Sequence, residues 1–518
     1  MSGARWPLMM TLDDIVRRNG LRFPDKPALV CDGAVCSWAE LDRRVTRLGN
    51  AFLDAGLRGG DPVAVLLGNC SEYFEIYFAC ARAGLVAVPV NYRLAGSELE
   101  QIIDHAQPSL LITDGEYAGQ ALAIQNLPAL RWCISTEDVQ GFEDYRSIVD
   151  GAEATPVSAK TNETFAIFYT SGTTGLPKGA LVSHRNLEMN GYNQAIADRS
   201  VPGDVNLLAT PIYHMGAVFM AVTYMMLGCT QHILRKFDPG AWLALLEQGR
   251  ASVALLVPTM INAVVNDPGL RRYDLSSLRL VFYGGGPMPV SVLERAVERL
   301  ACGFTQGYGL TETLEATFLV SEDHVIDGSE TQTRRLASAG REAVGAEVRI
   351  VDEAGAGLGA GETGEILIKS ESVIAGYWNN PKETANVIRN GWFHTGDLGY
   401  LDEDRYLFVV DRKKDMVISG GMNIYSKEIE SVLYRHPAVL EAAVIGLPDE
   451  EWGEIVTAVI ALKPGQEASE KELVDLCRAS LAGYKKPRKV FFLNELPKNP
   501  SGKILKRVLR ENLAGKPT

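Results

Sequence analysis

The sequence contains little cysteine: eight residues are scattered over 518 positions, without a CxxC pair. The seven histidines show no ligand-like spacing with them, so neither a disulfide framework nor a Cys/His metal site is indicated. No run of about 18 apolar residues occurs, and the N-terminal apolar stretch is too short for a secretory signal. We therefore expect no membrane span, no export and a cytoplasmic protein.

Positive charge is also in short supply. The formal net charge is −13, the isoelectric point is near 5.2, and no Lys/Arg-dense stripe with interleaved aromatic residues is present. Nucleic acid is therefore not an expected partner. Hydrophobic residues, in contrast, make up 46% of the chain, which is enough for several domains with large packed cores.

Strand-like apolar runs alternate with amphipathic runs through most of the chain, which predicts α/β layers around parallel sheet. Residues 61–69 and 252–259 are expected strands, and 71–84 an expected helix. Beyond about residue 340 short strands dominate, and from Asp411 strand and helix patterns alternate again. We predict a large N-terminal domain over 1–410, with α/β subdomains and a β-rich subdomain, and a small mobile α+β C-terminal domain over 411–518.

Residues 168–184, "FYTSGTTGLPKGALVSH", predict a phosphate-binding loop after an apolar strand. Glycines let backbone N–H groups face an anion, while hydroxyls and one lysine add donors. A Walker A loop is excluded, because Pro177 follows Gly172 by five residues and Lys178 precedes Gly179. The alternative is a solvated linker. The candidate ligands are Thr170, Ser171, Gly172, Thr173, Thr174, Gly175 and Lys178.

Several motifs in the same order along almost the whole chain resemble the adenylate-forming superfamily, of the acyl-CoA synthetase or fatty-acid or aryl-CoA ligase type. They are "YTSGTTGLPKG", "GYGLTE", "GEILIKS", "GYWNNPKET", "GWFHTGDLG", "DRKKDMVISGGMNIY" and "PKNPSGKILK". The resemblance implies that a carboxylic acid and ATP form an acyl-adenylate and pyrophosphate. CoA then takes the acyl group as a thioester. ATP, Mg²⁺ and coenzyme A are the implied cofactors, and a fatty or aromatic acid is the implied partner, with homodimer formation left open.

The resemblance also assigns residues to the nucleotide. Tyr308 is expected beside the adenine, Thr311 at the α-phosphate, and Glu312 with Thr170 at Mg²⁺. A carboxylate and a hydroxyl are suitable oxygen ligands for this cation. Asp397 and Arg412 are the expected ribose contacts, since a carboxylate can accept two hydrogen bonds from ribose hydroxyls. The remaining expected nucleotide-binding residues are Gly284, Gly285, Gly286, Pro287, Gly307 and Gly309.

In the C-terminal part, the resemblance makes Lys503 the catalytic lysine that meets the carboxylate and the α-phosphate. By composition alone Lys503 is a solvated surface lysine. Asp411 stands at the expected hinge, about which the C-terminal domain would rotate between the two half-reactions. The segment expected at the pantetheine of coenzyme A is Ser419, Gly420 and Gly421. Lys414 is a further expected cofactor-binding residue.

The segment "PIYHMGAVFM", residues 211–220, resembles the wall of the acyl pocket. His214 stands where amino-acid-activating relatives carry an aspartate, so α-amino acids are disfavoured. We include His214 among the catalytic candidates, although a lone histidine beside apolar residues is more often a core or gating residue. An acyl chain or an aromatic ring is expected among Met215, Val218, Met260, Gly285 and Gly309.

Glu315 departs from the family pattern, which has small residues just beyond "GLTE". We expect its side chain to turn to solvent or to pair with an arginine. The alternative is a buried, unpaired carboxyl that selects a cationic or hydrogen-bond-donating acid.

Two hypotheses remain for the acceptor of the acyl group: coenzyme A or a separate carrier protein. A basic patch could meet the CoA phosphates: Tyr484, Lys485, Lys486 and Arg488.

The glycine-rich stretch "GAGLGA" at 355–360 imitates a dinucleotide fingerprint but is followed by a turn and a strand, so we expect a hairpin loop.

Overall fold

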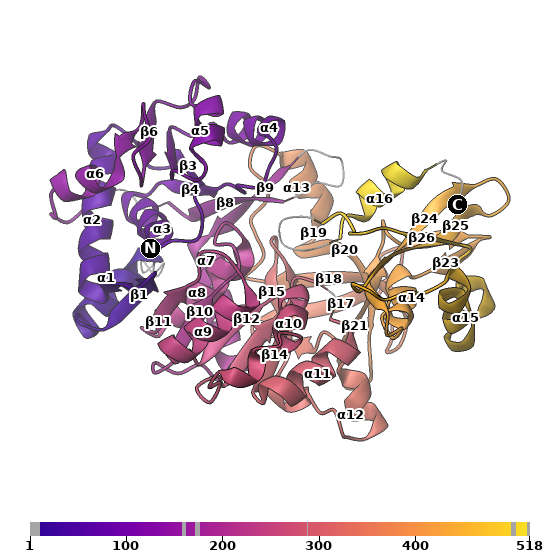
Figure 1. The fold of residues 1–518 in the computed structure, drawn as a ribbon. Helices are drawn as coiled ribbons and strands as arrows, with labels where there is room; N and C mark the ends of the chain where they lie inside the picture. The colour runs from indigo at the N-terminus through magenta and orange to yellow at the C-terminus, as the bar shows by residue number, and fades with distance from the viewer. Residues whose placement is uncertain (1–10, 158–161, 171–176, 287, 499–503, 515–518) are drawn as a thin grey trace, which may run out of the picture.

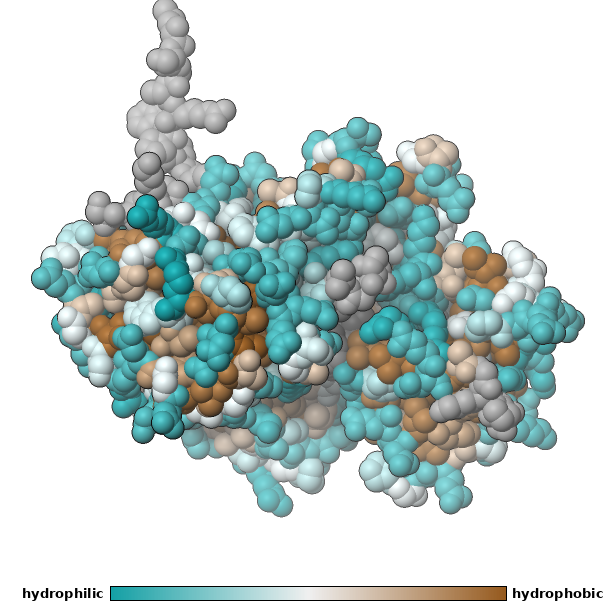
Figure 2. Space-filling model, turned by 90° about the horizontal axis from the view of Figure 1, so that it is seen from above, coloured by the Kyte–Doolittle hydropathy of each residue, from teal (hydrophilic) through white to brown (hydrophobic). Residues whose placement is uncertain are grey.

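The computed structural model describes residues 11–157, 162–170, 177–286, 288–498 and 504–514. A large body carries the N-terminal elements, and a smaller body at the right of Figure 1 carries the C-terminal ones. Seen from above, the surface is mostly hydrophilic, with hydrophobic patches on both bodies (Figure 2). Within the described ranges no helix has the length and apolar character needed to cross a membrane.

The first sheet of the large body has seven described strands in the order β7-β6-β5-β3-β4-β8-β9. Strands β3 to β8 are parallel to one another, and only β9, at the edge, is antiparallel to its neighbour β8. Every residue of β3 is buried, as expected for a strand covered by helices on both faces. The expected strand at 61–69 and the helix after it are therefore confirmed. The strands are β3 (Pro62–Leu66), β4 (Val86–Pro89), β5 (Leu110–Thr113), β6 (Trp132–Ser135), β7 (Glu143–Asp144), β8 (Thr164–Thr170) and β9 (Lys178–Ser183). The accompanying helices are α1 (Asp13–Arg22), α2 (Trp38–Asp54), α3 (Ser71–Ala83), α4 (Gly96–Ala106), α5 (Ala118–Ile124) and α6 (Tyr145–Gly151).

The second sheet has nine described strands in the order β16-β15-β14-β13-β12-β10-β11-β1-β2. Its centre is parallel, whereas β15 returns antiparallel to β14 with a register shift between Tyr308 and Gly309. The strands are β1 (Pro27–Cys31), β2 (Ala34–Ser37), β10 (Val205–Leu208), β11 (Thr230–Ile233), β12 (Val253–Leu256), β13 (Leu280–Tyr283), β14 (Gly303–Leu310), β15 (Leu314–Leu319) and β16 (Arg341–Glu342). The helices are α7 (His184–Ala197), α8 (Met215–Met226), α9 (Pro239–Gly249), α10 (Pro258–Val265), α11 (Val290–Leu300) and α12 (Glu330–Arg335), with short 3₁₀ turns at Leu270–Arg272 and Ser321–Asp323.

A third, antiparallel sheet follows, as the short strands beyond residue 340 predicted. It contains β17 (Ala346–Val351), β18 (Gly364–Ser370), β19 (Ile388–Arg389), β20 (Trp392–Leu401) and β21 (Leu407–Arg412), with helix α13 (Pro381–Val387). Residues 355–360 connect the antiparallel pair β17 and β18, so the hairpin interpretation of "GAGLGA" is confirmed. In Figure 1 this sheet lies between the large sheets and the C-terminal body.

The C-terminal body has its own sheet and its own buried cores. Its elements are β22 (Val417–Ser419), β23 (Met422–Ile424), α14 (Ser426–Leu433), β24 (Val439–Asp449), β25 (Gly453–Leu462), α15 (Glu470–Ser480), a 3₁₀ turn at Gly483–Lys485, β26 (Lys489–Phe492) and α16 (Lys506–Leu513). The predicted α/β class with a small α+β C-terminal unit is confirmed. The exact domain boundary at Asp411 stays a prediction, because β21 continues the third sheet through Arg412.

Candidate active site

Thr170 and Glu312, the predicted magnesium pair, lie in contact. Thr170 ends β8, and Glu312 lies in the turn between β14 and β15. The Thr170 hydroxyl donates to Glu312 Oε1 over 3.4 Å, and the Tyr377 hydroxyl donates to the same oxygen over 2.9 Å. Thr311 is half-buried in the same turn. Two oxygen-bearing side chains from separate sheets therefore converge here.

These groups fit a Mg²⁺ ion that is held mainly by substrate phosphates. No group of three or more His, Cys, Asp or Glu side chains suited to a metal occurs in the described part of the chain. Magnesium characteristically takes one or two protein carboxylates, and phosphate oxygens and water complete its shell. Glu312 and Thr170 match that requirement in kind and number.

Lys178 begins β9 and forms an ion pair with Glu383 of α13. Its ammonium also lies 5.6 Å from the centroid of the Tyr377 ring. The bond to Lys178 is the main cause of a lowered Glu383 pKa. Lys178 is thus tied to α13 beside the magnesium pair. Tyr377 and Glu383 have no predicted role, although both belong to the quoted motif "GYWNNPKET".

The residues expected at the adenine and the ribose, Tyr308, Asp397 and Arg412, also lie in contact. Tyr308 donates its hydroxyl hydrogen bond to Asp397 Oδ2 over 2.9 Å. Asp397 and Arg412 face each other on β20 and β21, and Arg412 Nε lies 3.1 Å from Asp397 Oδ1, an ion pair that falls short of hydrogen-bond geometry. Burial and then the Asp397 charge raise the pKa of Tyr308 well above its ordinary value. Tyr308 therefore stays a neutral donor.

The predicted glycines let backbone segments approach closely. A Cβ on Gly284 would lie 2.8 Å from the Gly307 carbonyl oxygen, and one on Gly309 would overlap the Leu314 carbonyl. Gly285 has φ +74°, a left-handed conformation that glycine adopts without strain. Gly285 is exposed, and its neighbour Gly286 is partly buried. A flat ring could approach such a backbone without meeting side chains.

Seven predicted site residues lie outside the described residues, so the structure does not place them. They are Ser171, Gly172, Thr173, Thr174, Gly175, Pro287 and Lys503.

The predicted coenzyme A segment forms the tight turn between β22 and β23. Gly420 and Gly421 have φ values of +58° and +76°, which explains why glycine occupies both positions after Ser419. The Gly420 amide donates to the Trp452 carbonyl over 2.9 Å. Burial and neighbouring Arg412 lower the pKa of Lys414.

The basic patch "AGYKKPRK" is partly committed to protein contacts. Lys485 lies 2.7 Å from Glu428, and the Arg488 guanidinium lies 4.1 Å from the centroid of the Trp452 ring. Asp411, the predicted hinge, is buried, and its carboxylate accepts hydrogen bonds from the backbone and hydroxyl of Ser426 at the start of α14. Asp411 therefore joins the last strand of the third sheet to the first helix of the C-terminal body.

His214 occupies the position before the first residue of α8, where it is partly buried and makes no side-chain capping hydrogen bond. Within the described residues its Nε2 has no hydrogen-bond partner. Burial, with a smaller effect of Arg93, lowers its pKa to about 4. His214 is therefore neutral at pH 7 and offers one unused ring nitrogen.

The expectation that Glu315 faces solvent or pairs with an arginine is wrong. Glu315 lies in β15 with 7% of its surface exposed, and its Oε2 has no partner among the described groups. Burial, and to a lesser degree Asp198, raises its pKa to about 8. Every residue of β15 is buried, because the strand lies inside the second sheet. Its position in the fold therefore overrides the usual preference of glutamate for solvent.

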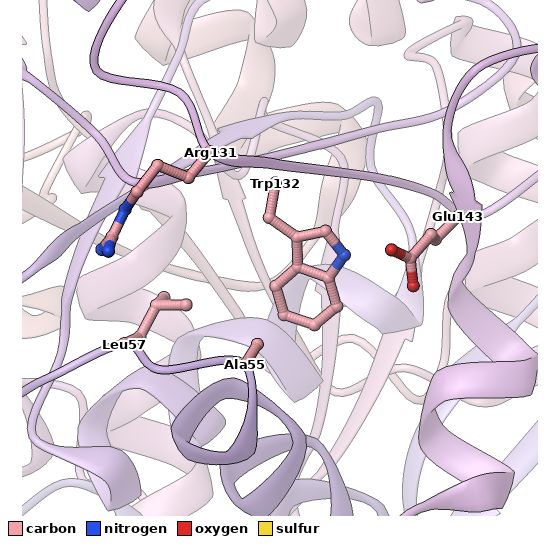
Figure 3. A pocket seen from close by; sticks show the side chains of 5 residues that line it. All are labelled: Ala55, Leu57, Arg131, Trp132 and Glu143. Carbon is pink, nitrogen blue, oxygen red and sulfur yellow. The ribbon is translucent and has the colours of Figure 1, made fainter.

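A pocket of about 320 Å³ lies away from this constellation. Figure 3 shows Trp132 at its centre, between the Arg131 and Glu143 side chains, with Ala55 and Leu57 below. None of the predicted site residues lines it. We assign it no part in the chemistry.

Comparison with known families gives two matches along the chain. The AMP-binding enzyme family matches residues 16–378, and the AMP-binding enzyme C-terminal domain matches residues 428–503. The two matches together include most of the described site residues.

Individual relatives extend over nearly the full length. A feruloyl-CoA synthase from an Amycolatopsis species is 38% identical over 95% of this chain and 97% of its own. The fatty acid–[acyl-carrier-protein] ligase ScoC of Streptomyces coeruleorubidus is 35% identical, covering 98% of both chains. The structure of o-succinylbenzoate CoA synthetase from Bacillus subtilis, in complex with its acyl-adenylate intermediate, superposes with a TM-score of 0.85 at 30% identity, covering 97% of this chain and 98% of that one.

Proposed function

The chain belongs to the AMP-binding enzyme family, and we propose that it is an AMP-forming carboxylic acid–CoA ligase. The acid carboxylate attacks the α-phosphorus of ATP, giving an acyl-adenylate and pyrophosphate. The CoA thiol then attacks the acyl carbon, so that a thioester forms and AMP leaves. The observation that carries this proposal is the convergence of Thr170 with Glu312 and of Tyr308 with Asp397.

In the first step the described residues hold ATP rather than react with it. Asp397 accepts hydrogen bonds from the ribose hydroxyls, and Tyr308 and Arg412 hold its carboxylate in place. Glu312 and Thr170 would hold Mg²⁺, and the Tyr377 hydroxyl orients the Glu312 carboxylate for that role. Bound Mg²⁺ neutralises charge on the phosphates. The loop around residues 171–175 and Lys178 bind the phosphates that leave as pyrophosphate, and Thr311 contacts the α-phosphate.

Lys503 approaches the carboxylate and α-phosphate in this step, where its ammonium offsets the repulsion between two anions. For the second step the C-terminal unit rotates about Asp411 and brings Ser419, Gly420 and Gly421 to the pantetheine, with Lys414 nearby. The support for a hinge at Asp411 is its position near the end of β21, where its carboxylate accepts a hydrogen bond from Ser426 at the start of α14. Replacing Asp411 by proline should trap one orientation and stop turnover, while unchanged turnover would contradict the hinge.

Coenzyme A is the acceptor we favour over a carrier protein, because CoA ligases are prominent among the relatives. The test combines the protein with ATP, Mg²⁺ and short, medium, long-chain and aromatic acids, and measures pyrophosphate and AMP. Saturable, CoA-dependent AMP release supports this function. AMP release that requires a separate carrier protein would support the alternative represented by the ScoC relative.

We also place the enzyme in the cytoplasm, where its eight free thiols would stay reduced. A homodimer is a further proposal, which light scattering of the purified protein tests directly.

A further inference from the structure

Glu315 places an unpaired carboxyl oxygen against the nucleotide-binding strand. On antiparallel strands β14 and β15, a Cβ built on Gly307 would lie 2.5 Å from Glu315 Oε2 and 2.5 Å from the tip of the Phe282 ring. Only the missing side chain of Gly307 leaves room for both groups. With 7% of its surface exposed, Glu315 is too deeply buried for solvent to satisfy that oxygen freely.

A second unpaired group lies on the adjoining helix. Asn190 of α7 is fully buried, and its Oδ1 accepts a hydrogen bond from the Glu315 backbone amide over 2.9 Å. The Nδ2 of the same side chain has no partner in the part of the chain that is described. A buried donor and a buried oxygen are thus both left unsatisfied, which carries a desolvation penalty.

The surrounding residues link this pair to the expected acid pocket. The Phe282 ring lies 5.8 Å from the Phe219 ring in an edge-to-face arrangement. Phe219 is on α8, five residues after His214, which corresponds to about 7.5 Å along a helix. The Phe219–Phe282 contact therefore links α8, which begins beside His214, to the surroundings of Glu315 Oε2.

We propose that Glu315 and Asn190 bind a hydroxyl group at the distal end of the acid, so that the preferred substrate is a hydroxylated aromatic acid. This assignment rests on the proposed acid activation. A hydroxyl both donates and accepts, and so satisfies Glu315 Oε2 and Asn190 Nδ2 together. An ammonium group only donates and leaves Asn190 Nδ2 unpaired. A plain hydrocarbon chain leaves both groups unpaired.

The test compares 4-hydroxycinnamate with cinnamate, two acids that differ only in the hydroxyl. For the native protein, kcat/KM from pyrophosphate release should favour the hydroxylated acid by about 100-fold or more, as in sites built around a substrate hydroxyl. Glu315→Leu should bring this ratio close to one, mainly by reducing activity toward 4-hydroxycinnamate. Glu315→Gln, which keeps a hydrogen-bonding carbonyl, should restore part of the preference.

Glu75→Gln is the matched control, because Glu75 is a buried carboxylate that Arg44 and Tyr145 already satisfy. It should lower thermal stability and leave the ratio unchanged. If Glu315→Leu is insoluble, Asn190→Ala tests the same site and should reduce the ratio by about tenfold.

An unchanged ratio in the folded Glu315 or Asn190 variants would overturn the proposal and leave these groups holding only a buried water. A native preference for 4-aminocinnamate or for unsubstituted acids would overturn it too. If the hydroxyl preference is absent but other acids still release pyrophosphate, the proposed ligase function is retained. If no acid releases pyrophosphate, the ligase function itself is refuted.

Discussion

The two halves of the candidate site differ in how their carboxyl groups are partnered. On the nucleotide side, Glu312 receives hydrogen bonds from Thr170 and Tyr377, and Asp397 accepts one from Tyr308 and forms an ion pair with Arg412, although its Oδ1 accepts no hydrogen bond among the described residues. On the acid side, buried polar atoms of His214 and Glu315 have no partner among the described residues.

This difference indicates how each half achieves recognition. Partnered groups hold one geometry before the ligand arrives, which suits a nucleotide common to a whole family. Unpartnered buried groups carry a desolvation cost that only the correct ligand removes, which suits discrimination among acids. The comparison predicts general losses of activity from nucleotide-side substitutions and substrate-dependent effects from acid-side ones.

Replacing Lys503 by alanine should have the largest effect, because Lys503 is expected to touch both halves at the moment of adenylation. We expect pyrophosphate release to fall by about 10³-fold for every acid, the loss typical of one preorganised charge-stabilising group. Thioester formation from a supplied acyl-adenylate and CoA should remain near the native rate. Equal loss in both assays would contradict the assigned role.

Replacing Glu312 by glutamine should reduce kcat/KM by about 10²-fold and raise the Mg²⁺ concentration needed for half-maximal rate. Tyr377→Phe, which removes one hydrogen bond to the same oxygen, should act in the same direction but more weakly. Titrating Mg²⁺ at fixed ATP measures both. An unshifted Mg²⁺ dependence in Glu312→Gln would remove the metal assignment and weaken the contrast between the halves.

The sequence predicted the elements whose pattern is local. The buried strand β3, the helix α3 and the hairpin between β17 and β18 all follow from apolar runs, helical periodicity and glycine turns. The order of strands within each sheet was not predictable in this way, since strand neighbours such as β4 and β8 are far apart in sequence.

The site was predictable where a motif carries its own chemistry and not where it depends on the fold. Thr170, Glu312, Tyr308 and Asp397 could be named from their motifs, but their mutual contacts required the folded chain. Glu315 was misjudged, because local sequence cannot show that every residue of β15 is covered.

Replacing Asp397 by asparagine should raise the KM for ATP by about tenfold, or roughly 1.4 kcal/mol, because a neutral amide accepts ribose hydrogen bonds less strongly. Tyr308→Phe should have a smaller effect in the same direction, since it removes one of the contacts that position Asp397. Initial rates at varied ATP measure both variants. The relative preference among acids should not change, and a changed preference would contradict the division of the site into two halves.

The last prediction concerns stability rather than activity, and it isolates the acid side. The pKa of Glu315 is raised from 4.5 to about 8, so between these values the folded protein binds a proton that the unfolded chain releases. The free energy of unfolding should therefore fall as pH rises through this interval, by at most about 1.4 kcal/mol per pH unit.

Glu315→Gln cannot titrate, so its stability relative to the native protein should increase from pH 5 to pH 8. Urea unfolding of both proteins at several pH values measures the difference. Asp198, with a pKa raised to about 7, and His214, with a pKa lowered to about 4, are present in both proteins, and their contributions largely cancel. A constant difference across the range would mean that Glu315 is ionised or paired in the native state. That outcome would remove Glu315 from the contrast between the two halves.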